Sequence, residues 1–196
     1  RYGFCTPGEP TQGAGAVAMV ISSSPRLVQL DNESASYTED VMDFWRPNYM
    51  DEAVVDGKLS IRTYLHALGE SWQGYHRLSG RVLDDFERFC YHLPFTRMGE
   101  KAHAHLLAIA AATEGRAVSS EPICRVSDSL HYNRQIGNTY TASLYISLSS
   151  MLEHADDLSG QRIGLFSYGS GCMASFISGI VVNRYQEWLT GDLHRD

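Results

Sequence analysis

The stretch QRIGLFSYGSGCMASFISGIVV, residues 161–182, decides the fold class. Two apolar segments, Arg162–Tyr168 and Met173–Val182, flank the sequence Gly-Ser-Gly, and this arrangement predicts two strands joined as a β-hairpin. The sequence upstream of the hairpin alternates between helical and strand-like patterns, which is typical of an α/β protein. We therefore expect a sheet covered by helices.

The other elements follow from hydrophobic periodicity and from turn residues. Ala14–Ser22 is a short apolar run that indicates a strand buried on both faces, and Arg26–Leu30 is a second expected strand. Residues 34–57 are interpreted as an irregular acidic segment. Ser60–Tyr75 has the spacing of an amphipathic helix with Ser60 as its N-cap. Further expected elements are a helical continuation over Val82–Phe89, a buried strand over Phe89–Leu93, and helices over Met98–Ala111, Ser120–Tyr132 and Thr139–Leu152.

Composition and charge narrow the class of protein. The chain has 196 residues, of which 43% are hydrophobic and 20% charged, and this suits one globular unit with a sizeable core. The formal net charge of −7 argues against broad binding to nucleic acid or to an anionic membrane, since both need a basic surface. The apolar run at 14–21 is too short to span a bilayer. We therefore expect neither nucleic acid nor membrane as a partner.

The cysteines and the first residue bear on the cellular setting. Arg1 is not an initiator methionine and no signal segment follows it, so the sequence is interpreted as a piece of a longer polypeptide. The cysteines are widely spaced without a Cys-x-x-Cys motif, which suits reduced thiols in a cytoplasmic protein better than disulfides or a zinc site. They are Cys5, Cys90, Cys124 and Cys172.

His92 is the most informative of the eight histidines. It ends an apolar strand-like segment, just before a proline and an expected helix start, and ligands gather at the carboxyl ends of strands in open α/β sheets. A hydrogen-bonded core histidine is the alternative interpretation. Cys90 lies on the same strand face, but two side chains side by side on one strand are poorly placed to act as a nucleophilic thiol and its base. The histidines at 103, 105 and 131 show no metal-ligand arrangement, so we predict no metal site.

Cationic and carboxylate side chains supply further candidates. Arg97 and Lys101 are four residues apart and share one face of the helix after His92, which suits either a phosphate-bearing ligand or an ordinary solvated surface. Asp43 stands beside Phe44 in TEDVMDFWRP, residues 38–47. A carboxylate partly buried among aromatic residues positions a ligand or handles a proton, unless the aromatic residues only anchor the loop.

Asn138 and the Gly-Ser-Gly turn are weaker candidates. Asn138 precedes a predicted helix, where an N-cap is the default role and an amide aimed at a ligand carbonyl is the functional alternative. The turn at Gly169–Gly171 is too short for a phosphate-binding loop, although backbone amides in such a turn are able to bind an oxyanion.

Five stretches together resemble one family, the hydroxymethylglutaryl-CoA (HMG-CoA) synthases in their bacterial form. In chain order they are GEPTQGAGAVAMVIS, YTEDVMDFWRP, YHLPFTRMGEKA, YNRQIGNTYTASLY and QRIGLFSYGSG. The resemblance runs across nearly all of the chain and implies a thiolase-like layered αβαβα fold made of two similar halves. It implies that residues 1–35 are closing strands of the first half, 36–88 a connecting loop and helices, and 89–196 the core of the second half.

The resemblance also implies an activity. The family are acyltransferases that condense acetyl-CoA with acetoacetyl-CoA to HMG-CoA in the mevalonate pathway, as dimers, with CoA thioesters as substrates and no resident cofactor. A cysteine carries the acetyl group, a glutamate takes the methyl proton, and a histidine binds the acetoacetyl thioester. Matched motif by motif, the resemblance implies that His92 is that histidine and that Asp43 is a second catalytic residue. It implies that Arg97 and Lys101 face CoA and that Phe44 lines the site. The remaining residues implied are Asn138 and Ser170, which contact the substrate, and Thr11, which lies near the acyl group.

The sequence departs from the family pattern in one respect. The nucleophilic cysteine and the glutamate base lie in the first half of the family's fold, and none of the four cysteines here stands in the nucleophile's sequence context. The family's terminal helical tail is also missing after Asp196. We therefore expect a chain that supplies the histidine half of the site, pairs with an upstream half, and is inactive alone.

Three other functions are left open by the sequence. A polyketide β-branching synthase of the same fold would take its acyl group from a carrier protein, and a basic surface around Arg97 would favour it. A non-catalytic binding or scaffolding subunit would keep the fold without the nucleophile. A hydrolase built on Cys90 and His92 is the third.

Overall fold

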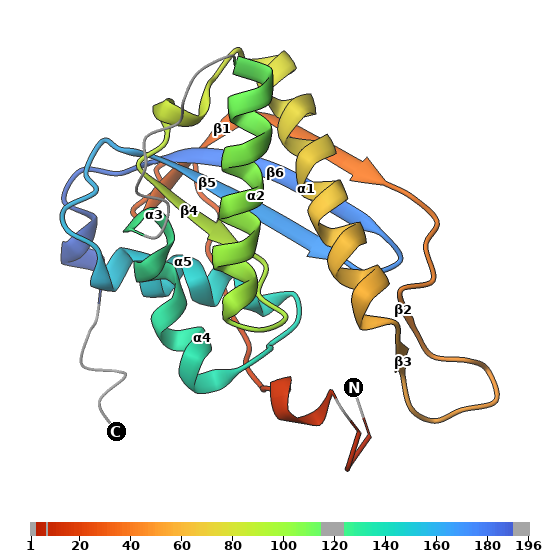
Figure 1. The fold of residues 1–196 in the computed structure, drawn as a ribbon. Coiled ribbons are helices and arrows are strands. Elements are labelled where there is room, and N and C mark those ends of the chain that lie inside the picture. The colour runs from red at the N-terminus through yellow and green to blue at the C-terminus, as the bar shows by residue number, and fades with distance from the viewer. Residues whose placement is uncertain (1–2, 7, 115–123, 190–196) are drawn as a thin grey trace.

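A four-stranded sheet forms the centre of the molecule. The computed structural model describes residues 3–6, 8–114 and 124–189. The strands lie in the order β1–β6–β5–β4, in which β6 is antiparallel to β1 and β5, and β4 is parallel to β5 (Figure 1). The strand bounds are Val28–Thr38 (β1), Arg88–Tyr91 (β4), Arg162–Gly169 (β5) and Met173–Val181 (β6), with a separate short pair of Phe44–Trp45 (β2) and Val54–Val55 (β3).

The hairpin of β5 and β6 confirms the prediction for residues 161–182. The two strands pair without interruption from Arg162 opposite Ile180 to Gly169 opposite Met173. The turn at 170–172 therefore joins them directly, at the same edge of the sheet where β4 ends.

Helices cover both faces of this sheet. Helices α1 and α2 pack together on one face, and α5 lies on the other, so the described chain has three layers (Figure 1). The helix bounds are Gly57–Ser79 (α1), Arg97–Glu114 (α2), Cys124–Ser127 (α3), His131–Ile136 (α4) and Ala142–His154 (α5), with short 3-10 turns at Glu9–Thr11, Leu83–Asp85, Asp128–Leu130 and Tyr185–Trp188.

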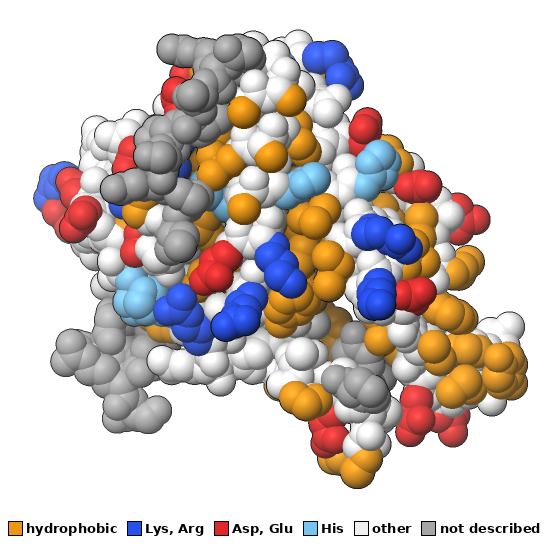
Figure 2. Space-filling view, viewed as in Figure 1, with side chains coloured by type: hydrophobic (Ala, Val, Ile, Leu, Met, Phe, Trp, Pro, Cys, Tyr) orange, Lys and Arg blue, Asp and Glu red, His pale blue; other side chains and the backbone are white. Residues whose placement is uncertain are grey.

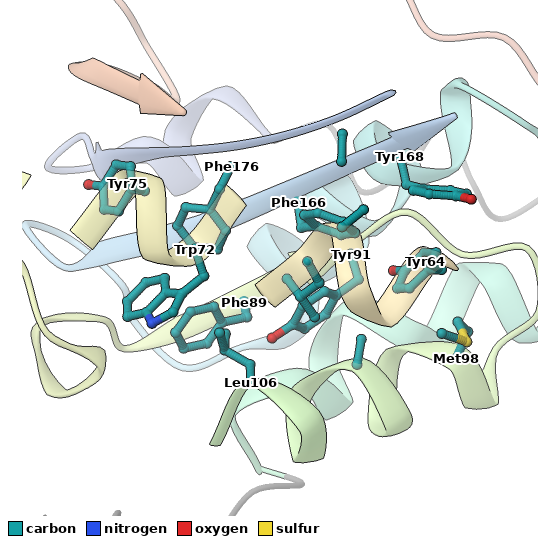
Figure 3. Packing of buried hydrophobic residues seen from close by; sticks show 14 of the residues in the cluster. Tyr64, Trp72, Tyr75, Phe89, Tyr91, Met98, Leu106, Phe166, Tyr168 and Phe176 are labelled. Carbon is teal, nitrogen blue, oxygen red and sulfur yellow. The ribbon is translucent and has the colours of Figure 1, made fainter. Parts of the chain in front are cut away.

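The larger core lies between the sheet and the helices α1 and α2. Tyr64, Trp72 and Tyr75 share one face of α1 because of their helical spacing, and they pack with aromatic residues of the strands such as Phe89 and Phe176 (Figure 3). Alternate strand residues point to the opposite face and pack against α5. These strand residues and α5 form a second, smaller hydrophobic cluster. It includes Cys90, Leu144, Met151, Leu152, Ile163, Leu165 and Val181.

The apolar run at 14–22 does not form the expected buried strand. It has no strand partner among the described residues, and its side chains are exposed, Val20 by 93% and Ile21 by 85%. A strand needs the backbone groups of a neighbouring strand, and an apolar composition does not supply that neighbour. The strand expected at 26–30 is confirmed in part, because β1 begins at Val28 and continues to Thr38 through a segment predicted to be irregular. The domain boundary placed at residue 35 falls inside β1.

The start of α1 also differs from the prediction. The helix begins at Gly57 and its N-cap is Asp56, not Ser60. The Asp56 carboxylate accepts hydrogen bonds from the backbone N–H groups of Lys58 (3.1 Å) and Leu59 (3.0 Å). Asp56 therefore satisfies donors that the first turn of a helix leaves unpaired.

The end of α1 overturns the helical continuation predicted over 82–89. Gly80 follows the helix with φ of 69°, a left-handed conformation that favours glycine and terminates the helix. Leu83–Asp85 then forms a 3-10 turn, and Arg88 already begins β4. The buried strand expected from Phe89 onward is confirmed as β4.

The remaining helices agree with the sequence in type and approximate bounds. The segments predicted at 98–111 and 139–152 are α2 and α5. The helix predicted at 120–132 begins outside the described residues, and its described part is broken into α3, a 3-10 turn and α4. No helix in the described ranges is long and apolar enough to cross a lipid bilayer.

Candidate active site

His92 lies directly after β4 and next to the start of α5. Its backbone N–H donates to the carbonyl of Phe166 on β5 (2.8 Å), and its own carbonyl accepts from the hydroxyl of Tyr64 on α1 (2.8 Å). Its ring nitrogen Nδ1 lies 3.0 Å from Oγ of Ser143 in the first turn of α5. Contacts from three elements therefore hold this residue at the carboxyl end of a parallel strand, where α/β sheets bind ligands.

Burial keeps the His92 imidazole neutral. Loss of solvation lowers the pKa of His92 to about 4, so the ring is uncharged at neutral pH. A neutral imidazole donates one hydrogen bond and accepts another. The side chain is nevertheless only half-buried, whereas His103 on α2 is sealed in the core. Part of the His92 side chain is thus accessible to solvent or to a ligand, which a purely structural histidine does not require.

Asp43 is the second candidate side chain of the site and is fully buried. Its Oδ2 accepts a hydrogen bond from the hydroxyl of Tyr168 at the end of β5 (3.1 Å), and its Oδ1 accepts from the backbone N–H of Gly171 in the β5–β6 turn (3.1 Å). Its backbone carbonyl accepts from the N–H of Asp56, the cap of α1 (2.9 Å). These bonds tie the loop before β2 to the hairpin turn and to the start of α1.

Tyr168 connects the carboxylate to the histidine. Its ring lies 6.3 Å from the His92 ring and 4.8 Å from the Tyr64 ring, measured between centroids. Burial and the neighbouring Asp43 carboxylate raise the pKa of Tyr168, so its hydroxyl keeps its proton and donates a hydrogen bond to Asp43. The structure thereby brings His92 and Asp43 to the two sides of one tyrosine.

The β5–β6 turn and the loop after β1 form a shallow pocket. The two segments are joined by hydrogen bonds of Glu39 with Cys172, N–H to carbonyl in both directions (3.1 and 2.6 Å). Ser170 is exposed at this turn, and Phe44 is half-buried in β2 beside the loop. The pocket is lined by Thr38, Glu39, Asp40, Ser170, Gly171, Cys172 and Met173.

The two cysteines nearest the site are not activated as nucleophiles. Burial raises the pKa of the Cys90 thiol, and its Sγ donates toward Sδ of Met151 on α5 (3.6 Å). Burial and the carboxylates of Asp43 and Glu39 likewise raise the pKa of Cys172. A reactive cysteine has a lowered pKa, so the hydrolase built on Cys90 is not supported.

Arg97 and Lys101 lie on the first two turns of α2, shortly after His92, and both are exposed. Lys101 Nζ stands 5.5 Å from the centroid of the Phe95 ring. Figure 2 shows several Lys and Arg side chains on the face formed by α1, α2 and α4. Neither Arg97 nor Lys101 forms an ion pair with a described residue, so both charges face solvent.

Asn138 and Thr11 meet at the loop before α5. The backbone N–H of Asn138 donates to the Thr11 carbonyl (2.9 Å), and the Asn138 carbonyl accepts from the N–H of Gly13 (2.9 Å). The side-chain Oδ1 of Asn138 accepts from the backbone N–H of Tyr140 (2.8 Å), which is a local capping contact. This loop leads within one turn to Ser143, the neighbour of His92.

Sequence reasoning missed three residues that hold the candidate groups. Ser143 contacts the His92 ring, Tyr64 binds the His92 carbonyl, and Tyr168 binds Asp43. Tyr168 and Ser143 both stand within the quoted motifs, and that membership is the signal that could have found them. Tyr64 is part of a core stripe, and nothing in its local sequence separates it from its neighbours.

The sequence of this chain is similar to those of known proteins. The family model for the C-terminal region of hydroxymethylglutaryl-coenzyme A synthase matches residues 28–123 and 116–193. The HMG-CoA synthase of Enterococcus faecalis is 43% identical over 196 residues, which cover 99% of this chain and 50% of that protein. A polyketide biosynthesis 3-hydroxy-3-methylglutaryl-ACP synthase of Bacillus subtilis is 34% identical over 182 residues, covering 91% of this chain and 43% of that protein.

Solved structures show the same relationship. A structure of MvaS in complex with 3-hydroxy-3-methylglutaryl coenzyme A matches with a TM-score of 0.85 and 42% identity, over 95% of this chain and 51% of that one. An HMG-CoA synthase complexed with CoA matches with a TM-score of 0.87 and 38% identity, over 98% of this chain and 49% of that one. The chain spans about half the length of these relatives. It has their thiolase-like α/β fold, and it belongs to the hydroxymethylglutaryl-CoA synthase family as a C-terminal portion.

Proposed function

We propose that this chain supplies the acetoacetyl-CoA-binding part of an HMG-CoA synthase, which condenses acetyl-CoA with acetoacetyl-CoA in the mevalonate pathway. The 43% identity to the Enterococcus faecalis enzyme and the match to a structure holding HMG-CoA support this activity. The nucleophilic cysteine and the glutamate base come from the other half of the family's fold. The complete reaction is therefore proposed for an enzyme that combines both halves, and this chain alone does not turn over.

One observation carries the proposal: a neutral, half-buried imidazole is fixed in place at the end of a parallel strand. His92 has a pKa lowered to about 4 by burial, and its backbone and Nδ1 are held by protein groups. A neutral ring donates a hydrogen bond to the acetoacetyl thioester carbonyl, and this polarises the carbonyl without placing a full positive charge beside it.

The other candidate residues have supporting parts in this proposal. Asp43, held by Tyr168 and Gly171, fixes the turn that borders the substrate and acts as a second catalytic group. Arg97 and Lys101 attract the phosphates of CoA, because exposed cations bind phosphate groups. Phe44, Ser170, Asn138 and Thr11 line the path of the acyl chains.

The proposed chemistry comes from side chains, with CoA thioesters as substrates and no resident cofactor. The proposal also includes a homodimer that works in the cytoplasm. No cluster of three or more potential metal ligands is found in the described part of the chain.

The test is His92→Ala in the complete enzyme, with the two half-reactions measured separately. We expect condensation with acetoacetyl-CoA to fall about 10²–10³-fold, as for loss of one polarising donor, while acetylation of the cysteine by acetyl-CoA is largely retained. His154→Ala, at an exposed histidine far along α5, is the control and leaves both half-reactions unchanged. Equal loss of both half-reactions in His92→Ala would contradict the assigned role.

A carrier-protein substrate is the second candidate. The exposure of Arg97 and Lys101 favours it, since carrier proteins present acidic helices, and the Bacillus subtilis relative is named as an ACP synthase. The complete enzyme should therefore be offered its acyl group on free CoA and on a carrier protein. Faster turnover from the carrier protein, lost in Arg97→Glu, would establish this candidate. Absence of any acylation would instead indicate a non-catalytic binding subunit.

A further inference from the structure

We propose that Ser143 is a positioning residue that fixes the tautomer of His92, with the ring proton on Nε2. The proposal rests on the proposed function and deepens it, because it names the residue that decides which ring nitrogen donates. A neutral imidazole carries one N–H group, and this group polarises a carbonyl only if it belongs to the nitrogen that faces the ligand.

The inference begins with the Ser143 hydroxyl, which is fully buried in the first turn of α5. Among the described residues, two groups lie within hydrogen-bond distance of its Oγ: the backbone N–H of Leu93 at 3.1 Å and Nδ1 of His92 at 3.0 Å. The Leu93 N–H can only donate, so Oγ accepts from it. The hydroxyl proton then needs an acceptor, and among the described residues Nδ1 of His92 is the atom placed to accept it.

This assignment determines the state of the ring. When Nδ1 accepts from Ser143 it carries no proton, so the single proton of the neutral ring is on Nε2. In the other tautomer, Nδ1–H would donate to Oγ, and the hydroxyl proton of Ser143 would be buried without an acceptor, which is unfavourable. Burial lowers the pKa of His92 to about 4, and this independently disfavours the doubly protonated ring at neutral pH.

Two neighbouring residues, His92 and Leu93, supply both groups that contact the Ser143 hydroxyl. Leu93 follows His92 directly, so the N–H that orients the Ser143 hydroxyl belongs to the peptide next to the ring. On the other side, Tyr64 holds the His92 carbonyl at 2.8 Å. Nε2 of His92 makes no hydrogen bond to a described residue and is not among the buried unpartnered atoms, which leaves it for a ligand.

Ser147 provides a matched control. It lies one turn further along α5 and is equally buried, but its Oγ has no hydrogen-bond partner among the residues that the structure describes. Ser143→Ala and Ser147→Ala thus remove the same atom from the same helix. Only the first removes a contact with His92.

The decisive measurement is ¹⁵N NMR of the full chain with labelled histidines at neutral pH, with His92→Gln to assign the signals. In the unsubstituted chain we expect an unprotonated Nδ1 and a protonated Nε2. Ser143→Ala brings protonated Nδ1 into the population, Ser147→Ala changes neither signal, and Ser143→Thr, which keeps the hydroxyl, restores the original pattern. A protonated Nδ1 in the unsubstituted chain would overturn the proposal, and this result does not depend on whether any Ser143 variant folds. An unchanged spectrum in Ser143→Ala would overturn it as well.

Kinetics of the complete enzyme separate this proposal from the proposed function. Ser143→Ala should lower kcat/KM for acetoacetyl-CoA at least about tenfold and spare cysteine acetylation, as expected for loss of an interaction that matters only at the histidine. Ser147→Ala should change neither. If the NMR signals respond to Ser143→Ala and the kinetics do not, Ser143 still sets the tautomer and the proposed role of His92 is wrong.

Discussion

The carboxylate of Asp43 shows how single residues hold this site together. It is fully buried, and its two oxygens are taken by the Tyr168 hydroxyl and the Gly171 N–H, each at 3.1 Å. A buried carboxylate is tolerated only when hydrogen bonds replace the water it has lost. The position of Asp43 therefore depends on the β5–β6 turn, and the turn depends on Asp43.

This dependence predicts different costs for two substitutions of Asp43. Asp43→Asn keeps an oxygen for the Gly171 N–H, and its amide donates to the Tyr168 hydroxyl, so we expect a loss of about 1 kcal/mol in the free energy of unfolding. Asp43→Ala leaves both donors without an acceptor and should cost about 3 kcal/mol. Urea denaturation of the two variants measures the difference. Equal losses would mean that these hydrogen bonds do not stabilise the fold.

His103 on α2 makes stability depend on pH. Burial, helped by the Arg125 charge, lowers its pKa from 6.5 to about 4, and its Nδ1 is paired with the Tyr91 hydroxyl at 2.9 Å. Between those two pH values the unfolded chain binds a proton that the folded chain does not. Stability therefore falls as the pH falls through this window, by about 3 kcal/mol for this group, and is not reduced further by it below pH 4.

The variant His103→Gln tests this contribution, because glutamine can still bond Tyr91 and does not titrate. Unfolding free energies at pH 7 and pH 4.5 should differ less in the variant than in the unsubstituted chain. His92, whose pKa is also lowered to about 4, contributes to the remaining difference. The same pH dependence in both proteins would exclude His103 as a source.

At the scale of the elements, α1 carries the clearest prediction. Its N-cap is the Asp56 side chain, whereas Ser60 lies inside the helix. Asp56→Ala should cost about 1 kcal/mol, and Ser60→Ala should stay within about 0.5 kcal/mol of the unsubstituted chain. Thermal and urea unfolding of both variants decide between the two caps. A larger loss of stability in Ser60→Ala than in Asp56→Ala would instead support Ser60 as the N-cap.

The elements also show what sequence can and cannot predict here. The β5–β6 hairpin, α1, α2 and α5 follow from local periodicity, and His92 follows from its place after an apolar strand. The prediction of a buried strand at 14–22 was wrong, because an apolar composition indicates burial but does not show which strand would pair with the run. Ser143 and Tyr168 escaped local analysis because they meet His92 and Asp43 across 51 and 125 residues of chain, which only tertiary folding brings together.

At the scale of the whole molecule, the exposed apolar run at 14–22 offers a test of the proposal that another half completes the enzyme. Ile21 is 85% exposed, so Ile21→Asp should change the stability of this chain by less than about 0.5 kcal/mol. In the complete enzyme, where we propose that the other half covers this run, the same substitution should cost about 2–3 kcal/mol. Denaturation of both forms provides the comparison. An equal effect in both would refute burial of this run by the other half.

The pairing of β1 with β6 has a consequence for folding during synthesis of the chain. These strands are joined across a long span of chain, as the contact between Ser36 and Ser175 shows with its separation of 139 residues. A ribosome that adds about 5–20 residues per second needs about 7–28 s to deliver the partner of β1. During that interval β1 has no β6 with which to pair, and a strand without its neighbour exposes backbone groups that are able to pair with other chains. Completion of this sheet therefore waits until β6 has been synthesised.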